Sequence, residues 1–148
     1  MDVKGFDGSG IATEQTIKAL HHHIWVREAE AAGVYREVDV NVGGRPIEVT
    51  AEEVPEKIAE FVIWLNEMDK GFGGSGIAAF AAEAHFRMAK IHPFEDANGR
   101  TCRLLVNFLL ARNGHPAIEL PEGFRIGYYE VFEGSDFTAL TTQIASLL

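Results

Sequence analysis

A long apolar segment between Ile77 and Ile91 constrains the fold more than any other part of the sequence. The segment has helical length, Pro93 ends it, and it carries almost no polar face. A helix that is apolar nearly all the way round has to be covered on every side. We therefore expect a central, buried helix over 77–91, and its small residues allow close packing: Ala78, Ala79, Ala81, Ala82 and Ala84.

Apolar residues at helical spacing predict further helices around this one. These helices are expected over residues 13–31, 52–68, 99–112 and 123–133, and over the last part of the chain after a cap at Ser135 or Asp136. Thr13 is a suitable N-cap for the first helix, and Gly33 is expected to stop it. Pro55 lies in a first turn, where proline is tolerated, and Asn113-Gly114 is a C-cap signal.

The core is expected to form from the apolar stripes of these helices, together with Phe94 and Cys102. His21, His22 and His23 belong to the first helix, because apolar residues flank them in a helical pattern. The predicted stripes are Ile17, Leu20 and Ile24; Val54, Ile58, Phe61, Val62, Leu65 and Met68; and Phe137, Leu140, Ile144 and Leu147.

The stretch 34–50 changes to a two-residue period around the turn signal Gly43-Gly44. This alternation predicts a β-hairpin that is polar on one face. The fold class is therefore mainly α, a helical bundle with one hairpin, in a single domain over 1–148 that begins with a flexible segment, 1–12. The alternating apolar residues of the hairpin are Val38, Val40, Val42, Ile47 and Val49.

The composition limits the classes of protein to which the chain can belong. The 148 residues carry a net charge of −9, which repels phosphate backbones, so nucleic acid is not an expected partner. The single cysteine excludes an intrachain disulfide framework and a cysteine-based zinc site. No apolar run is long enough for a membrane, and the polar N-terminus does not resemble a signal peptide. We expect a cytoplasmic protein without a membrane partner; a secreted effector domain that lacks an ordinary signal peptide stays open.

One polar segment joins the two most apolar of the predicted helices. Residues 92–103 read HPFEDANGRTCR, and polar groups at such a joint are costly unless they are satisfied or used. Free N–H groups at the helix start near Gly99, with Arg100 and Arg103 on the first turns, favour phosphate binding. Asp96 can hold Mg²⁺ together with phosphate oxygens, and His92 titrates near neutrality, which suits a general base.

Each of these residues also has a purely structural interpretation. His92 can be a hydrogen-bonded structural histidine, Asp96 can be a helix cap, and two arginines at helical spacing are usually a solvated face. The combination in one short segment is much less probable as an accident than any single residue. The segment therefore predicts Mg²⁺-nucleotide binding beside a base that can activate a hydroxyl.

The same segment resembles the signature of the Fic family, His-x-Phe-x-(Asp/Glu)-(Gly/Ala)-Asn-Gly-Arg-x-x-Arg, at every defining position. Residues 33–36, which read GVYR, and the predicted hairpin are similar to the flap of that family. Leu65-Asn66 and residues 112–116, which read RNGHP, are similar as well. The resemblance covers roughly residues 15–148 and implies a Fic-type helical bundle.

The resemblance implies a protein adenylyltransferase, which moves AMP from ATP to a Ser, Thr or Tyr hydroxyl of a target protein and releases pyrophosphate. By resemblance, His92 is the base and Asp96 binds the Mg²⁺ cofactor. Asn98 and the backbone at Gly99 cradle the α-phosphate. The remaining phosphate ligands implied by the resemblance are Arg100 and Arg103.

Further parts of the site are implied in the same way. Ala97 stands in the phosphate loop, where most members have glycine, and Tyr128-Tyr129 resembles an aromatic pair near the nucleotide base. The flap would bind a target protein by pairing with its backbone. The residues expected to do so are Val38, Asp39, Val40, Asn41 and Val42.

Other functions stay open at this point. Doc-like phosphotransferases carry lysine at the position of Gly99, so the glycine argues against phosphate transfer. Transfer of another nucleotide monophosphate, removal of AMP from a modified protein, and a catalytically silent nucleotide- or peptide-binding module are the remaining alternatives. Silent members lose the histidine or an arginine, and this chain keeps both.

Many Fic proteins carry an inhibitory helix that reads (Ser/Thr)-x-x-x-Glu-(Gly/Asn). No serine or threonine of this sequence has a glutamate four residues later. Inhibition is then expected from an antitoxin-like partner protein or from another part of a longer protein. Glu133 is the nearest candidate for an inhibitory residue within the chain.

Overall fold

The computed structural model describes residues 12–25, 30–42, 44–71, 76–120 and 137–148. The predicted helix over 123–133, with Tyr128-Tyr129 and Glu133, and the caps Ser135 and Asp136 lie outside these residues. Of the expected flexible segment, only Ala12 is described. It is buried, and the side chain of Asn66 binds both its N–H and its carbonyl oxygen, at 3.0 and 2.9 Å. Ala12 is therefore part of the folded domain.

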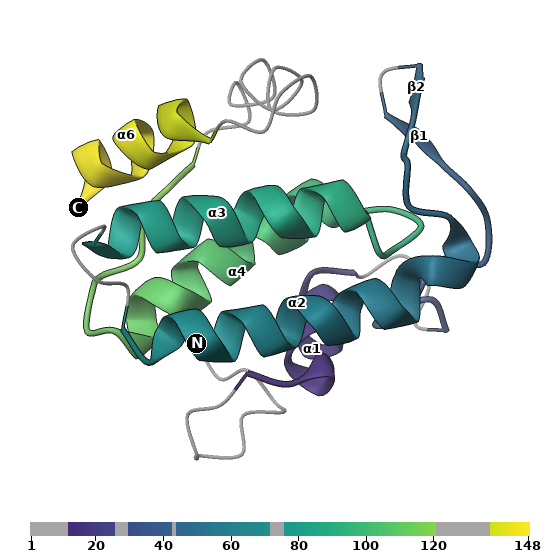
Figure 1. The fold of residues 1–148 in the computed structure, drawn as a ribbon, viewed down its shortest axis with the longest axis horizontal. Helices are drawn as coiled ribbons and strands as arrows, with labels where there is room; N and C mark the ends of the chain where they lie inside the picture. The colour runs from purple at the N-terminus through teal and green to yellow at the C-terminus, as the bar shows by residue number, and fades with distance from the viewer. Residues whose placement is uncertain (1–11, 26–29, 43, 72–75, 121–136) are drawn as a thin grey trace.

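The described elements confirm a mainly α fold with one hairpin, which stands where α3 ends and α2 begins (Figure 1). Among the helices of the described ranges, none combines the length and the apolar composition that crossing a membrane requires. The elements are α1 (Glu14–Ile24), β1 (Asn41–Val42), β2 (Arg45–Pro46), a 3₁₀ turn (Ala51–Glu53), α2 (Val54–Asp69), α3 (Gly76–Ile91), α4 (Asn98–Arg112) and α6 (Thr138–Leu147).

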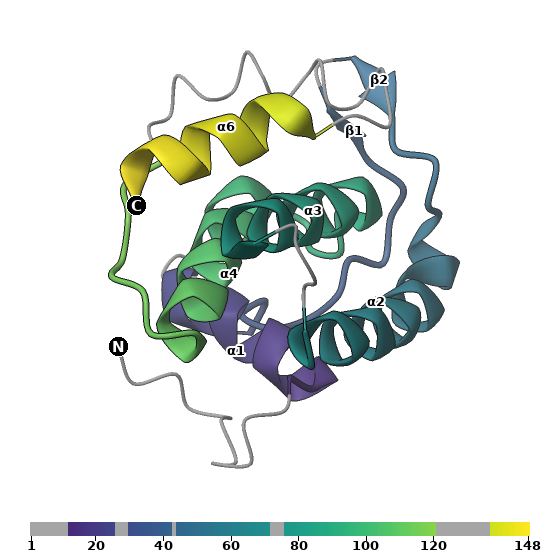
Figure 2. The same ribbon diagram turned by 60° about the vertical axis from the view of Figure 1, so that its left-hand side comes forward.

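α3 is the central helix, as its composition predicts. It contacts α2, α4 and α6, and Figure 2 shows these helices arranged around it. Phe80 of α3 is 1% exposed, and Ala84 and Met88 are fully buried. The same core includes Phe94 and Cys102, whose exposed fraction is zero. The polar segment between α3 and α4 is therefore anchored at both ends in the core.

The first helix is shorter than predicted. Thr13 caps α1, because its Oγ1 accepts the N–H of Thr16 and its own N–H donates to Thr16 Oγ1. The helix ends at Ile24 and not at residue 31, since Trp25 takes an extended backbone conformation. The apolar stripe continued in the sequence, but the backbone at Trp25 leaves the helix.

Gly33 does not end the first helix, contrary to the prediction. It lies in a turn with a φ of +74°, a conformation that glycine adopts without strain. A Cβ at this position would lie 3.0 Å from the carbonyl oxygen of Lys18 in α1. Glycine is thus required both by the backbone angle and by the close approach to the helix.

The hairpin is present, but its ladder is much shorter than the alternation predicts. Each strand has two residues, with Asn41 opposite Pro46 and Val42 opposite Arg45. Proline has no N–H to donate, so it weakens the ladder at that point. Gly44 lies in the turn between the strands with a φ of +81°.

Arg36 gives a second reason why the ladder stops. Continued in the same register, Val38 would lie opposite Val49, but the carbonyl oxygens of both residues accept hydrogen bonds from the Arg36 guanidinium. Val38 is 54% exposed, which the predicted alternation did not anticipate. Beyond the ladder and the bond from the Ile47 N–H to the Val40 carbonyl oxygen at 3.0 Å, the two legs of the hairpin are therefore joined by the Arg36 side chain.

The other predicted stripes are confirmed with one exception. Pro55 lies in the first turn of α2. Leu147 is 42% exposed, because it belongs to the last turn of α6, where no described element covers it. The stripe residues of α2 and α6 that are buried are Val54, Ile58, Phe61, Leu65, Leu140 and Ile144.

Candidate active site

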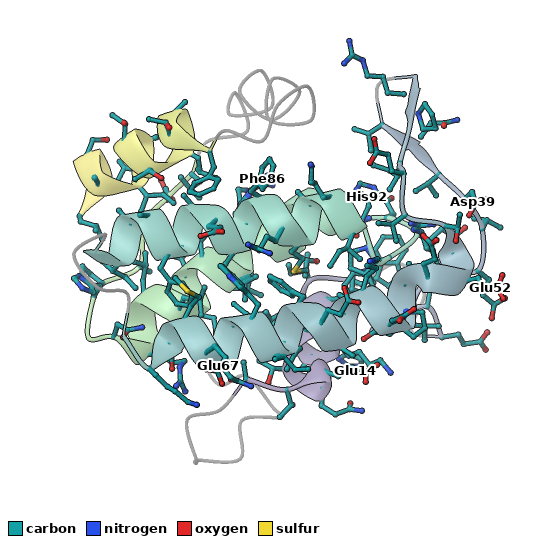
Figure 3. The ribbon with its side chains drawn as sticks, in the orientation of Figure 1. Glu14, Asp39, Glu52, Glu67, Phe86 and His92 are labelled. Carbon is teal, nitrogen blue, oxygen red and sulfur yellow. The ribbon has the colours of Figure 1, made fainter. Side chains whose placement is uncertain are left out.

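The polar segment forms a short loop between α3 and α4, beside the root of the hairpin. His92 lies at the C-terminal end of α3, on the side of the hairpin (Figure 3). Two residues of the loop have left-handed backbone angles although neither is glycine: His92, with a φ of 51°, and Ala97, with a φ of 62°. Such angles cost free energy and persist where the surroundings fix them, often at functional sites.

Ala97 occupies the N-cap position of α4 without capping it. Its methyl group cannot accept a hydrogen bond, and Thr101 is the first residue of α4 whose N–H reaches a helical acceptor, the Ala97 carbonyl oxygen at 3.0 Å. The N–H groups of Asn98, Gly99 and Arg100 precede it. An uncapped helix N-terminus presents free donors and the positive end of the helix dipole to an anion.

The side chain of Asn98 shapes the loop. It is 3% exposed, its Oδ1 accepts the N–H of Phe94 at 3.0 Å, and its Nδ2 donates to the carbonyl oxygen of Phe94 at 2.8 Å. Both ends of the amide are therefore used within the protein. A contribution of Asn98 to phosphate binding would come from its backbone N–H, and that role stays a prediction.

His92 is uncharged at neutral pH. Burial and, second, the positive charge of Arg36 lower the pKa of its imidazole to about 4, against smaller opposing effects of the Ala89 backbone and Asp96, so it does not titrate near neutrality as the sequence predicted. Its Nδ1 is buried without a hydrogen-bond partner among the described residues. A neutral imidazole whose second nitrogen, Nε2, is not buried in this way can accept a proton from an incoming hydroxyl.

Arg36 connects this histidine to the hairpin, and the sequence analysis did not assign it a role beyond its place in the GVYR segment. The guanidinium is almost completely buried. It donates Nε–H to the His92 carbonyl oxygen at 2.7 Å and Nη2–H to that of Ile91 at 3.2 Å. The same group binds Val38 at 2.9 Å and Val49 at 2.5 Å through their carbonyl oxygens. An arginine within an alternating apolar pattern was the sequence signal for this role.

The neighbouring backbone strengthens this connection. The Arg36 N–H donates to the Pro93 carbonyl oxygen at 2.9 Å, and Tyr35 forms an isolated antiparallel bridge with Phe94. Tyr35 also donates its hydroxyl to Glu14 of α1 at 2.8 Å. The start of the hairpin segment and the loop after α3 are therefore held as one unit.

His21 is the second site residue that the sequence analysis missed. It is 2% exposed, and its ring stacks on Phe94 with centroids 3.8 Å apart. Its Nε2 lies 3.0 Å from the carbonyl oxygen of Asp96. Position 21 is four residues after Ile17 on the buried stripe of α1, and this spacing could have separated it from the exposed His22 and His23.

The two predicted phosphate arginines lie on the first turns of α4. Arg100 is exposed, and Arg103 is partly buried. Within the described residues, neither side chain has a hydrogen bond or an ion pair. Arg103 lies close to Gly99, because a Cβ added to Gly99 would be 3.4 Å from Arg103 Nη1. Charge and free N–H groups thus gather at one end of the helix.

Asp96 is exposed at the tip of the loop and has the chemistry that Mg²⁺ requires. Its Oδ1 accepts the Ala97 N–H at 2.7 Å, which leaves Oδ2 available. In the described part of the chain, no three His, Cys, Asp or Glu side chains gather as a metal cage. A single carboxylate fits Mg²⁺ held mainly by substrate phosphates and water.

The hairpin residues expected to bind a target lie beside this loop. Val38, Asp39 and Asn41 are exposed, and Val40 and Val42 are partly buried. A groove of about 370 Å³ runs along the second leg of the hairpin to Lys90 of α3. Tyr128-Tyr129 lies outside the described residues, so its predicted place near the base is untested.

Comparisons with known proteins agree with this arrangement. A family model described as the Fic/DOC family matches residues 11–110. Protein adenylyltransferase fic-1 of Caenorhabditis briggsae is 41% identical over 98 residues, which are 66% of this chain and 19% of that protein. Protein adenylyltransferase Fic of Culex quinquefasciatus is 37% identical over 101 residues, 68% of this chain and 20% of that protein. The chain spans about a fifth of the length of these curated relatives.

Solved structures share the fold. A Fic domain containing signaling protein from Bacteroides thetaiotaomicron superposes with a TM-score of 0.77 at 29% identity, over 93% of this chain and 59% of that chain. Fic-1 from C. elegans superposes with a TM-score of 0.75 at 30% identity, over 95% of this chain and 41% of that chain. The helices and hairpin described above are therefore the arrangement found in these proteins.

Proposed function

Because the chain belongs to the Fic/DOC family, we propose that it is a protein adenylyltransferase that transfers AMP from ATP to a Ser, Thr or Tyr hydroxyl of a target protein. The observation that carries this proposal is the pairing of a neutral His92 with an uncapped helix N-terminus across one short loop. Relatives named protein adenylyltransferase, which match two thirds of the chain, support the same reaction.

The transfer step makes one bond and breaks one at the α-phosphorus, and moves one proton. The hydroxyl oxygen of the target attacks the α-phosphorus of ATP, and its proton passes to the imidazole of His92. The bond between the α-phosphorus and the oxygen that leads to the β-phosphate breaks, and pyrophosphate leaves. Burial and Arg36 keep His92 unprotonated at neutral pH, so its ring can take the proton, and the negative charge of a bound triphosphate would raise its pKa toward the working pH.

The start of α4 holds the triphosphate in this proposal. The N–H groups of Asn98 and Gly99 bind the α-phosphate, and Gly99 leaves room for it beside the backbone. Arg100 and Arg103 bind the outer phosphates and balance the charge on the leaving pyrophosphate. Placement and charge neutralisation supply most of the catalysis in reactions of this kind.

Mg²⁺ is the proposed cofactor, with Asp96 as its protein ligand. When bound, the ion would neutralise charge on the phosphate oxygens. The protein's own part is to hold the Asp96 carboxylate, which the Ala97 N–H orients through Oδ1.

The hairpin is the proposed site for the target protein. An added strand would pair along the outer edge of the hairpin, since the carbonyl oxygens of Val38, Val40 and Val49 are already used within the protein. The hydrogen bonds of Arg36 fix the start of the hairpin against His92. A target segment paired with the hairpin would therefore present its hydroxyl near His92, the proposed base.

Labelled ATP tests the reaction. The purified chain is incubated with ATP labelled at the α- or the γ-phosphate, Mg²⁺ and a lysate of candidate targets. AMP transfer predicts protein labelling from the α-label only. Labelling from the γ-phosphate would indicate phosphate transfer, and ATP binding without labelling would indicate a silent binding module; either result contradicts the proposal.

Control by a separate inhibitory protein is part of the proposal. The sequence lacks the inhibitory motif, and Arg103 has no ion pair within the described residues. We therefore expect the isolated chain to modify itself in the presence of Mg²⁺ and ATP. A large gain in activity on changing a single glutamate of the chain, with Glu133 tested first, would reveal an internal inhibitor and contradict this expectation.

A further inference from the structure

The imidazole of His21 connects the turn before the flap to the tip of the catalytic loop. One ring nitrogen, Nδ1, lies 2.9 Å from the backbone nitrogen of Gly33, and the other, Nε2, lies 3.0 Å from the carbonyl oxygen of Asp96. The ring face stacks on Phe94 at an interplanar angle of 12°. Two hydrogen bonds and the ring stack therefore hold the His21 side chain in this orientation.

The backbone fixes the tautomer of this histidine. The Gly33 N–H is always a donor, so Nδ1 has to be the acceptor. A neutral ring then carries its proton on Nε2, which donates to the Asp96 carbonyl oxygen. Burial lowers the pKa of His21, which agrees with a neutral ring.

The backbone of Asp96 depends on the hydrogen bond from His21, because burial does not hold Asp96 as it holds its neighbours in the loop. Phe94 is buried and clamped by Asn98, and Ala97 is buried at the start of α4. Asp96 and the preceding Glu95 are exposed. Among the described residues, the Nε2–H of His21 is the one side-chain donor bound to the Asp96 backbone.

We propose that His21 is a positioning residue: its Nε2–H fixes the peptide of Asp96, and through it the direction in which the Asp96 carboxylate meets the Mg²⁺ of the bound nucleotide. This inference rests on the proposed function, since it concerns the cofactor ligand of that site. Groups that orient a metal ligand typically change metal affinity by about 10- to 100-fold when they are removed.

Two variants separate the two hydrogen bonds of the ring. In H21N, the amide oxygen replaces Nδ1 and keeps the bond from Gly33, but no donor reaches Asp96. In H21Q, the amide nitrogen replaces Nε2 and keeps the bond to Asp96. Both side chains are neutral amides and both remove the ring that stacks on Phe94; they differ by one methylene group and hence in which bond they preserve.

The readout is the dependence on Mg²⁺. Binding of a fluorescent ATP analogue is titrated with Mg²⁺ and repeated in EDTA, and AMP transfer is measured over the same Mg²⁺ range. H21N should raise the half-saturating Mg²⁺ concentration about tenfold or more, and H21Q should stay within about threefold of the wild type. Metal-free nucleotide binding should be the same in all three proteins, because the arginines and the α4 N-terminus are unchanged.

Thermal unfolding shows whether each variant folds. If H21N does not fold, H21F replaces it, since it keeps the ring on Phe94 and lacks both hydrogen bonds; it should show the same raised Mg²⁺ requirement. An unchanged Mg²⁺ requirement in H21N or H21F, or an equal defect in H21Q, overturns the inference. Wild-type protein without AMP transfer would contradict the proposed function instead, and the Mg²⁺ dependence of nucleotide binding would still test the role of His21.

Discussion

Arg36 donates its Nε–H to the carbonyl oxygen of His92 at 2.7 Å, and the same guanidinium helps to lower the pKa of the His92 imidazole. A buried cation beside a histidine disfavours the protonated ring. The hydrogen bond also holds the left-handed backbone of His92, whose φ is 51°. One side chain thus sets both the position and the protonation state of the proposed base, while its other nitrogens hold the two legs of the flap.

Replacing Arg36 should damage the flap and the base together. R36K keeps the charge, but one ammonium group cannot reach four carbonyl oxygens in the directions that the planar guanidinium serves. We expect R36K to lose about 2 kcal/mol or more of unfolding free energy, because buried carbonyl groups lose their partners. Chemical denaturation and the rate of AMP transfer measure the two effects. K70R, an exchange of like charge at an exposed lysine after α2, should change neither property. Normal stability and transfer in R36K would contradict this role of Arg36.

Replacing His92 should abolish transfer without abolishing nucleotide binding. In H92A the phosphate ligands of α4 remain, so ATP affinity should stay close to that of the wild type while AMP transfer nearly disappears. H22A is the matched control, because His22 is exposed on α1. Radiolabel transfer and ATP titration measure both properties. Transfer by H92A within threefold of the wild type would exclude His92 as the base.

The low pKa of His92 predicts how stability depends on pH. In the unfolded chain the imidazole takes up a proton near pH 6.5, but in the folded protein it does so near pH 4. Between these values the unfolded state binds more protons, so stability falls as the pH falls from 6.5 to 4. H92Q lacks this titration, and over that window it should gain up to about 3 kcal/mol relative to the wild type. Denaturation at pH 7, 5.5 and 4 measures the difference, and a constant difference would contradict the shifted pKa.

Gly99 should be required for productive binding of the nucleotide and not for folding. A Cβ at this position would meet Arg103 Nη1 at 3.4 Å, an ordinary contact with the end of a flexible side chain, so G99A should fold normally. G99K adds a cation and a long stem at the proposed phosphate site and should abolish AMP transfer. Transfer assays and thermal unfolding of both variants test this. Normal transfer by G99K would show that the triphosphate does not lie against the start of α4.

Replacing Ala97 by glycine should stabilise the folded protein. Its φ of 62° is unfavourable for a residue with a Cβ, and glycine removes that cost. We expect A97G to raise the unfolding free energy by about 0.5–1 kcal/mol, which corresponds to a rise in Tm of about 2–4 °C. A59G, at an exposed position within α2, should instead lower stability by about 1 kcal/mol. A decrease in Tm in A97G would mean that the surroundings hold Ala97 without strain.

Local patterns in the sequence determined the helices and the composition of the site. An all-round apolar segment can only be a central helix, and α3 is that helix. The motif residues from His92 to Arg103 were identified from their order alone, because a loop and the first turns of the following helix keep sequence neighbours together in space. The same local reasoning placed Thr13, Pro55 and Phe94 correctly.

Only the tertiary structure decided where the elements stop and which distant residues complete the site. The hairpin period predicted long strands, but Arg36 binds the carbonyl groups that those strands would have paired. His21 looked like one of three equivalent histidines, and packing against Phe94 and Asp96 distinguishes it. The hydrogen bonds from Arg36 to His92 and from His21 to Asp96 each join residues that are more than 50 positions apart along the chain. A periodic pattern indicates which face of a helix or strand is buried. Which distant residue that face contacts depends on the path of the chain in the tertiary structure, and no local pattern contains that information.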